Sequence, residues 1–116
     1  MSLTFPLIAL GGALGAVLRQ LSVSAIGAPL GVAVVNVLGS LLIGALFVLL
    51  AGRGEWQAFL MTGVLGGFTT FSAFSLDTLK LVEAGQVLHA GAYVAGSVLL
   101  SLAAVALGAA IARGLA

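Results

Sequence analysis

The sequence contains no cysteine and very little charge. Its 116 residues include four lysines and arginines, three aspartates and glutamates, and one histidine. The lack of cysteine excludes disulfides, thiolate metal sites and cysteine nucleophiles. Three carboxylates are too few for the clustered acidic groups of a membrane enzyme such as a small lipid kinase. With a net charge of +1 and no basic cluster, the chain also predicts no nucleic-acid partner.

What remains is mostly apolar. Hydrophobic residues make up 62% of the chain, charged residues 6%, and the mean hydropathy is +1.34. These values are typical of a protein that lies in a lipid bilayer. Because one spanning helix takes ~20 apolar residues, four spans would use about 80 and leave only short loops. We predict an all-α membrane protein in which residues 1–116 form a single domain of four transmembrane helices.

Turn signals place the ends of these helices. The predicted spans run from about Leu3 to between Leu18 and Ile26, from about Leu30 to Ala51, from Trp56 to about Lys80, and from about Leu88 to Ala112.

The first span carries a face of small residues and one charge. Gly11 with Gly15, and Gly12 with Ala16, form small-xxx-small pairs that let two helix backbones approach closely, which favours a packing role. Arg19 is followed by more apolar sequence. Its guanidinium therefore either snorkels to the membrane surface or faces an aqueous vestibule, and the residues alone leave both readings open.

The third span contains the least helix-like stretch, residues 66–74, with the sequence Gly-Gly-Phe-Thr-Thr-Phe-Ser-Ala-Phe. Glycine loses much backbone entropy in a helix and β-branched threonine loses rotamer freedom, so this stretch predicts an irregular turn halfway along the span. In hydrocarbon such a turn is tolerated only when protein covers it or it lines a wet cavity. We therefore predict a functional site at a mid-membrane break.

Several polar or aromatic residues recur at helical spacing. Asn36 lies one turn from Ser40; its amide either bonds across a helix interface, which the residues alone favour, or donates to an anion. Phe71 and Phe74 share a helix face, and core packing is the favoured reading of such a pair. The remaining candidates are a hydroxyl stripe at Tyr93, Ser97 and Ser101, a pair of opposite charges at Asp77 and Lys80, and a lone His89 expected at the membrane interface.

The basic residues do not select an orientation. In a four-span chain Arg53 and Arg113 lie on one side of the membrane and Arg19 and Lys80 on the other. Such a balance gives the positive-inside rule nothing to act on. Two copies inserted in opposite directions could then pair about an axis in the membrane plane, like an inverted repeat.

Three motifs together resemble the small Fluc-type (CrcB) fluoride channels: Gly-Gly-Ala-Leu-Gly-Ala-Val-Leu-Arg at 11–19, Val-Asn-Val-Leu-Gly at 35–39, and Gly-Gly-Phe-Thr-Thr-Phe-Ser-Ala-Phe-Ser at 66–75. The resemblance extends over all four spans. It implies a dual-topology antiparallel homodimer in the cell inner membrane that lets fluoride leave passively through two pores. It also implies one central sodium ion that is structural and not transported.

The resemblance also assigns roles to individual positions. The sodium would be held by the backbone carbonyls of Gly66 and Thr69, and Arg19 would lie near the vestibule. The fluoride pore would be lined by Asn36, Thr70, Phe71, Phe74, Tyr93, Ser97 and Ser101.

Three positions depart from the family pattern. Val32 replaces a common threonine, Ala73 a common hydroxyl residue, and Gln20 a common aromatic. The aliphatic side chains of Val32 and Ala73 cannot donate to an anion, so neither residue is placed in the site.

The main alternative to a fluoride channel is a small multidrug-resistance-type dual-topology transporter, which needs a membrane-buried carboxylate. Asp77 is the only candidate in this chain for that role.

Overall fold

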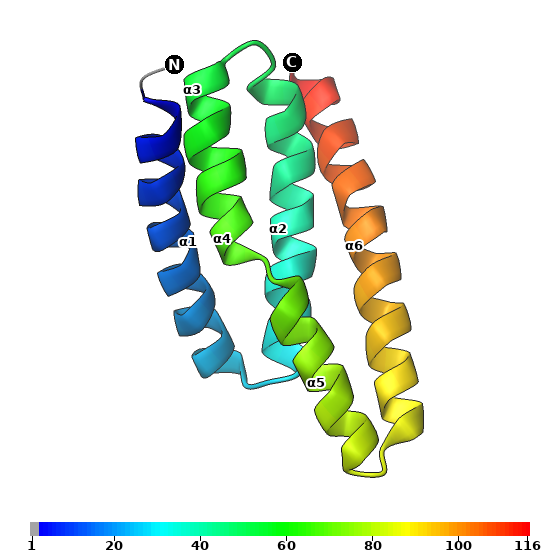
Figure 1. The fold of residues 1–116 in the computed structure, drawn as a ribbon. Helices are drawn as coiled ribbons and strands as arrows, with labels where there is room; N and C mark the ends of the chain where they lie inside the picture. Colours follow the sequence, from blue (N-terminus) through cyan, green and yellow to red (C-terminus); the bar gives the residue numbers. More distant parts are fainter. Residues whose placement is uncertain (1–2) are drawn as a thin grey trace.

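The computed structural model describes residues 3–116 as helices joined by short turns (Figure 1). Helices α1 (Thr4–Ile26), α2 (Leu30–Leu49) and α6 (Val87–Leu115) are continuous. With the segment Gly54–Glu83, which we call the broken helix, they give four stretches long and apolar enough to cross a membrane. The predicted all-α architecture with four candidate spans is therefore confirmed. Residues 1 and 2 of the predicted domain lie outside the described part.

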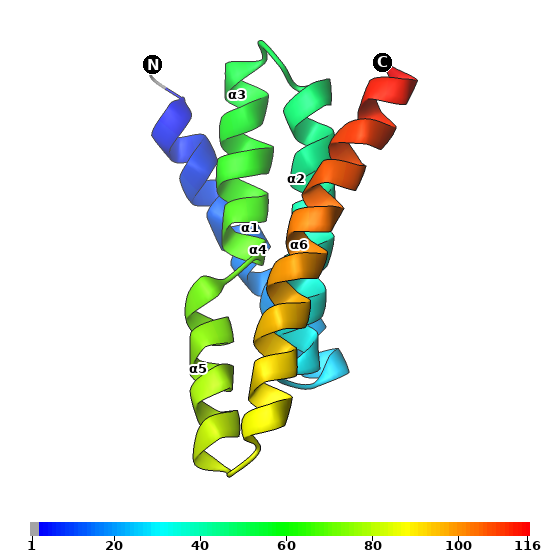
Figure 2. The same ribbon diagram turned by 90° about the vertical axis from the view of Figure 1, so that its right-hand side faces the viewer.

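The broken helix consists of four shorter elements. These are α3 (Gly54–Trp56), a π-helical segment η1 (Gln57–Leu65), α4 (Gly66–Phe68) and α5 (Phe71–Glu83). Two extended residues separate α4 from α5: Thr69 has φ −89° and ψ 158°, and Thr70 has φ −154° and ψ 123°. We call these two residues the break, and Figure 2 shows the change of direction there. The predicted interruption is confirmed, but it is shorter than the stretch 66–74.

Gly67, the second of the two glycines before the break, stays helical because it packs against α1. A Cβ built on Gly67 would lie 3.1 Å from the backbone nitrogen of Ala16, and one on Gly15 would lie 2.8 Å from that of Phe68. Backbones this close leave no room for side chains. The small-residue face of α1 therefore packs as predicted, and tertiary contact overrides the low helix propensity of glycine.

Glycines also join α2 to α6. A Cβ on Gly44 would lie 2.9 Å from the carbonyl carbon of Val105, and one on Gly108 would lie 3.0 Å from that of Leu41. The chain thus pairs α1 with the first half of the broken helix and α2 with α6 (Figure 1). Past the break, α5 leaves α1 and packs on α6, with Phe74 and Leu81 buried against Ala90 and Tyr93.

Gly15→Ala is expected to destabilise the protein by ~1–3 kcal/mol, because the new methyl group meets backbone that no rotamer change can move. Gly96→Ala is the matched control, since a Cβ there meets nothing within 4 Å. Thermal unfolding of the purified protein in detergent checks both variants. Equal melting temperatures for the two would contradict this account of the α1 contact.

The charges near the end of the broken helix differ from expectation. Asp77 is buried, with 7% of its surface exposed, and within residues 3–116 it forms no ion pair with Lys80. The predicted pairing is wrong because Asp77 lies on the face of α5 that also buries Phe74 and Leu81, whereas Lys80 is exposed. His89 is exposed, and its Nδ1 lies 3.1 Å from Oε1 of Gln86. Its place at the membrane interface stays a prediction.

Candidate functional site

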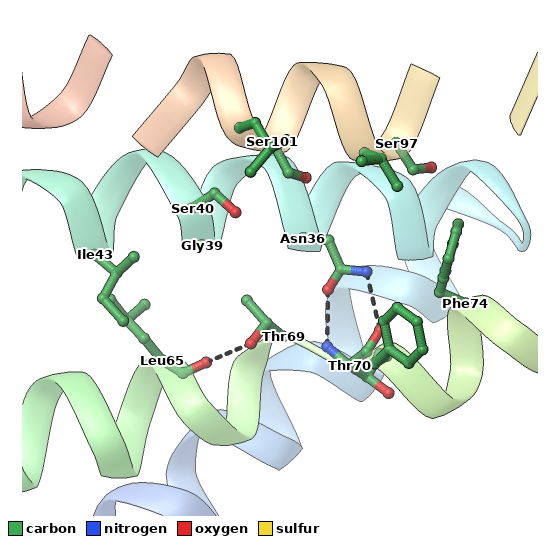
Figure 3. A pocket seen from close by; sticks show the side chains of 13 residues that line it. Asn36, Gly39, Ser40, Ile43, Leu65, Thr69, Thr70, Phe74, Ser97 and Ser101 are labelled. Atoms are coloured by element: carbon green, nitrogen blue, oxygen red, sulfur yellow. Dashed lines mark hydrogen bonds between the residues drawn. The ribbon is translucent and has the colours of Figure 1, made fainter. Parts of the chain in front are cut away.

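A groove of about 340 Å³ lies between α2, α6 and the break (Figure 3). Its lining consists of neutral residues: Asn36, Gly39, Ser40, Ile43, Leu65, Thr69, Thr70, Phe71, Phe74, Ser97, Val98, Ser101 and Leu102. All the predicted pore residues except Tyr93 are among them. Side chains up to 65 positions apart in the sequence, from Asn36 to Ser101, thus meet in one place.

Tyr93 lies just beyond the groove, in a row of three aromatic rings. The ring centroid of Phe74 is 5.5 Å from that of Phe71 and 5.3 Å from that of Tyr93, and both pairs are tilted. Phe74 is buried, as core packing predicts, but Phe71 has 78% of its surface exposed. The row therefore runs from the interior of the chain to its surface.

Asn36 holds the break through the backbone of Thr70. The Thr70 N–H donates to Oδ1 of Asn36 at 2.8 Å, and Nδ2 of Asn36 donates to the Thr70 carbonyl at 2.9 Å (Figure 3). This is the cross-helix bonding that the residues alone favour for Asn36. One amide N–H remains beyond the bond to Thr70, because an asparagine side chain has two.

The first residue of the break turns back onto the helix before it. Both the N–H and the hydroxyl of Thr69 donate to the Leu65 carbonyl, each at 3.0 Å. In a continuous helix the Gly66 carbonyl would accept the Thr70 N–H, but Asn36 takes that donor. Gly66 as a residue is exposed in the single chain. A freed hard oxygen of this kind suits a small cation, which fits the predicted sodium ligand.

Arg19 also reaches the break. Its Nη1 donates to the Gly67 carbonyl at 2.7 Å and lies 3.4 Å from the Thr69 carbonyl. These contacts direct the half-buried guanidinium into the protein, so it does not simply extend along the lipid to the surface. The vestibule role of Arg19 stays a prediction.

Two features of the site are not predicted by the sequence. Ser40 was noted only as a neighbour of Asn36, although its spacing of one helical turn places it in the same groove. Two side-chain oxygens, Oη of Tyr93 and Oγ of Ser97, are buried and receive no hydrogen bond from residues 3–116. Val32 and Ala73, by contrast, pack in the apolar cluster around Phe74.

Comparison with known proteins shows the family of this chain. A family model described as CrcB-like protein, Camphor Resistance (CrcB), matches residues 6–109. A Fluoride-specific ion channel FluC of Paracoccus denitrificans (strain Pd 1222) is 51% identical over 99% of this chain and 98% of the relative. Proteins of the same name from Cereibacter sphaeroides (strain ATCC 17029 / ATH 2.4.9) and Ruegeria sp. (strain TM1040) are 55% identical over 92% of both chains and 49% identical over 98% of both. The chain belongs to the CrcB-like family.

Proposed function

We propose that this protein is a fluoride-selective ion channel that lets fluoride leave the cell passively across the inner membrane. The observation that carries the proposal is the groove, in which the amide, hydroxyls and phenyl rings of the predicted pore gather beside the break. The names of the relatives support it, since each is called a fluoride-specific ion channel.

The neutral lining suits a small anion that must not be held too tightly. The edges of Phe71 and Phe74 carry the positive part of the ring quadrupole, and an amide or hydroxyl donates a hydrogen bond without adding a fixed charge. A cationic side chain in the groove would bind the anion more strongly and slow its release. The unpaired hydroxyl oxygens of Tyr93 and Ser97 extend the line of donors along α6.

Fluoride exit needs no pump, because the membrane potential itself drives the anion out of the cell. An inside-negative potential favours anion exit by about 2.3 kcal/mol per 100 mV for a full charge crossing. Fluoride that enters as neutral hydrogen fluoride and dissociates inside the cell would therefore flow out through an open pathway. The protein has only to provide that pathway and to reject the larger chloride ion.

The pore is proposed to be completed by a second copy in the opposite orientation. The balanced basic residues support insertion in both directions. The groove is open and Phe71 is exposed in the single chain, so a partner could cover this face. Gly66 and Thr69 of both copies would supply the backbone oxygens for a structural sodium ion, whose charge would balance the carbonyls where the two breaks meet.

Removing sodium tests the structural ion. Exchanging sodium for N-methylglucamine is expected to lower fluoride flux by roughly tenfold or more and to reduce the melting temperature, because an ion that binds only the folded dimer stabilises it. Thermal unfolding and flux are measured on the same preparation, and restoring sodium is the control. Unchanged stability and flux without sodium would contradict the proposed ion.

Fluoride efflux from proteoliposomes tests the function itself. Vesicles loaded with potassium fluoride are diluted into fluoride-free buffer with a potassium ionophore, with sodium chloride present on both sides, and a fluoride electrode follows release. We expect rapid fluoride release and retained chloride in a matched chloride experiment. Fluoride-tight vesicles containing folded protein would refute the proposal.

The alternative function is that of a small multidrug-resistance-type transporter, and one observation favours it. Asp77 is a buried carboxylate inside the broken helix, which a proton-coupled carrier requires. Such a carrier would take up a cationic drug in exchange for protons and would not release fluoride. Drug uptake driven by a pH gradient, abolished by Asp77→Asn, would favour this alternative over the channel.

A further inference from the structure

We propose that Arg19 is a positioning residue that holds the break in shape from within its own chain. Together with Asn36, Arg19 determines which backbone carbonyls at and just before the break accept a hydrogen bond from the protein and which stay free. This role differs from that of a charge in a vestibule, because it acts on the backbone of the neighbouring helix.

The contact of Arg19 places a cation against the C-terminal end of α4. Carbonyls at the end of a helix lack their helical donors and carry a partial negative charge, which favours a basic side chain there. Nη1 of Arg19 lies 2.7 Å from the Gly67 carbonyl, a distance typical of a charge-assisted hydrogen bond. Its second contact, 3.4 Å from the Thr69 carbonyl, is long and weak.

The glycine face of α1 explains how Arg19 reaches this position. Gly11, Gly15 and Arg19 follow one another at intervals of four residues, so they share one face of α1. The first two are buried against the backbone of η1 and α4. The close approach of the two helices therefore delivers the next residue on that face, Arg19, to the end of α4.

The backbone carbonyls of residues 65–70 fall into two groups, those that accept a hydrogen bond from the protein and those that do not. Leu65 accepts from Thr69, Gly67 accepts from Arg19, and Thr70 accepts from Asn36. The Gly66 carbonyl is deprived of its helical donor, and the Thr69 carbonyl has only the weak contact. These last two are the proposed sodium ligands, so in this step the inference rests on the proposed function. Without Arg19, the Gly67 carbonyl would be a third free oxygen and the end of α4 would lose its cap.

Amide hydrogen exchange of the full-length protein in lipid nanodiscs tests the role without reference to transport. In Arg19→Met, peptides that contain residues 69 and 70 are expected to exchange about tenfold faster than in the wild type, because one charge-assisted bond is lost. Arg19→Lys, which keeps the charge and one donor, is expected to give a smaller increase. Exchange in the α2–α6 contact is expected to stay at the wild-type rate in both variants.

Gln20→Met is the matched control, because Gln20 is the exposed neighbour of Arg19 and, within residues 3–116, its side chain bonds only to Ser24 of its own helix. It is expected to leave exchange at the break unchanged. Wild-type exchange at the break in Arg19→Met, or an equal increase throughout the protein, would overturn the inference. If Arg19→Met does not fold, an unchanged exchange rate at the break in Arg19→Lys would do the same.

A parallel fluoride assay separates this inference from the proposed function. With wild-type flux present, Arg19→Met is expected to lose most of it and Arg19→Lys to keep part. A wild-type protein without fluoride flux would refute the channel, but faster exchange at the break in Arg19→Met would still support the positioning role.

Discussion

Replacing Asn36 with leucine is expected to lower the fluoride flux by about a hundredfold or more, because the N–H and carbonyl of Thr70 would each lose a partner, at ~1–3 kcal/mol per buried group. The break could then no longer keep its extended backbone, and Thr70 could return its N–H to the Gly66 carbonyl as in a continuous helix. Flux from proteoliposomes, at equal amounts of folded protein, measures the effect.

Two further substitutions separate the backbone role of Asn36 from a general effect on the groove. Asn36→Asp keeps an acceptor for the Thr70 N–H but loses the donor to its carbonyl, so an intermediate flux is expected. Ser40→Ala removes one hydroxyl from the groove on the same face of α2 but leaves the bonds to Thr70 in place, so a smaller fall in flux than in Asn36→Leu is expected. Flux at the wild-type level in Asn36→Leu would contradict the role assigned to this contact.

Replacing Phe74 with isoleucine is the second large effect, with an expected fall in fluoride flux of about tenfold to a hundredfold. Isoleucine keeps a comparable apolar volume but has no ring edge to face an anion. It also ends the row of rings, because Phe74 lies between Phe71 and Tyr93 at centroid distances of 5.5 Å and 5.3 Å. Fluoride efflux is compared with dimer content by size-exclusion chromatography.

Phe71→Ile is expected to slow flux as well while leaving the fold intact, since 78% of the Phe71 side chain is exposed in the single chain. Phe47→Ile serves as the control, because Phe47 is an exposed residue of α2 that does not line the groove. It is expected to retain wild-type flux. Unchanged flux in both Phe71→Ile and Phe74→Ile would rule out a lining role for the rings.

The sequence predicts the four spans well because apolar length and turn residues determine them almost alone. Gly27 and Gly85, for example, have positive φ in the turns that close α1 and α5. The π-helical segment Gln57–Leu65 could not be foreseen, because the apolar length that predicts a span does not distinguish an α-helix from a π-helix. In the structure this segment packs against α1. The loss of the predicted Asp77–Lys80 pair could not be foreseen either, since composition does not say which face of α5 is covered.

The sequence predicts which residues form the site better than it predicts the contacts that these residues make. Spacing and resemblance together brought Asn36, Thr70 and Ser97 into one set, and the groove contains all three. They did not reveal that Asn36 and Arg19 bond to the backbone of the broken helix, because such contacts depend on the distance between helices. For the same reason the sequence predicts that Gly67 unwinds, whereas close packing against α1 keeps it helical.

The most direct test of the account is the reversal potential of single channels in a planar bilayer with sodium fluoride at a high concentration on one side and a low concentration on the other, where sodium chloride makes up the balance. A groove lined by neutral donors and phenyl rings beside the break predicts a reversal potential close to the Nernst value for fluoride. A reversal potential near zero, where a sodium-permeable or unselective pathway would place it, would contradict the account.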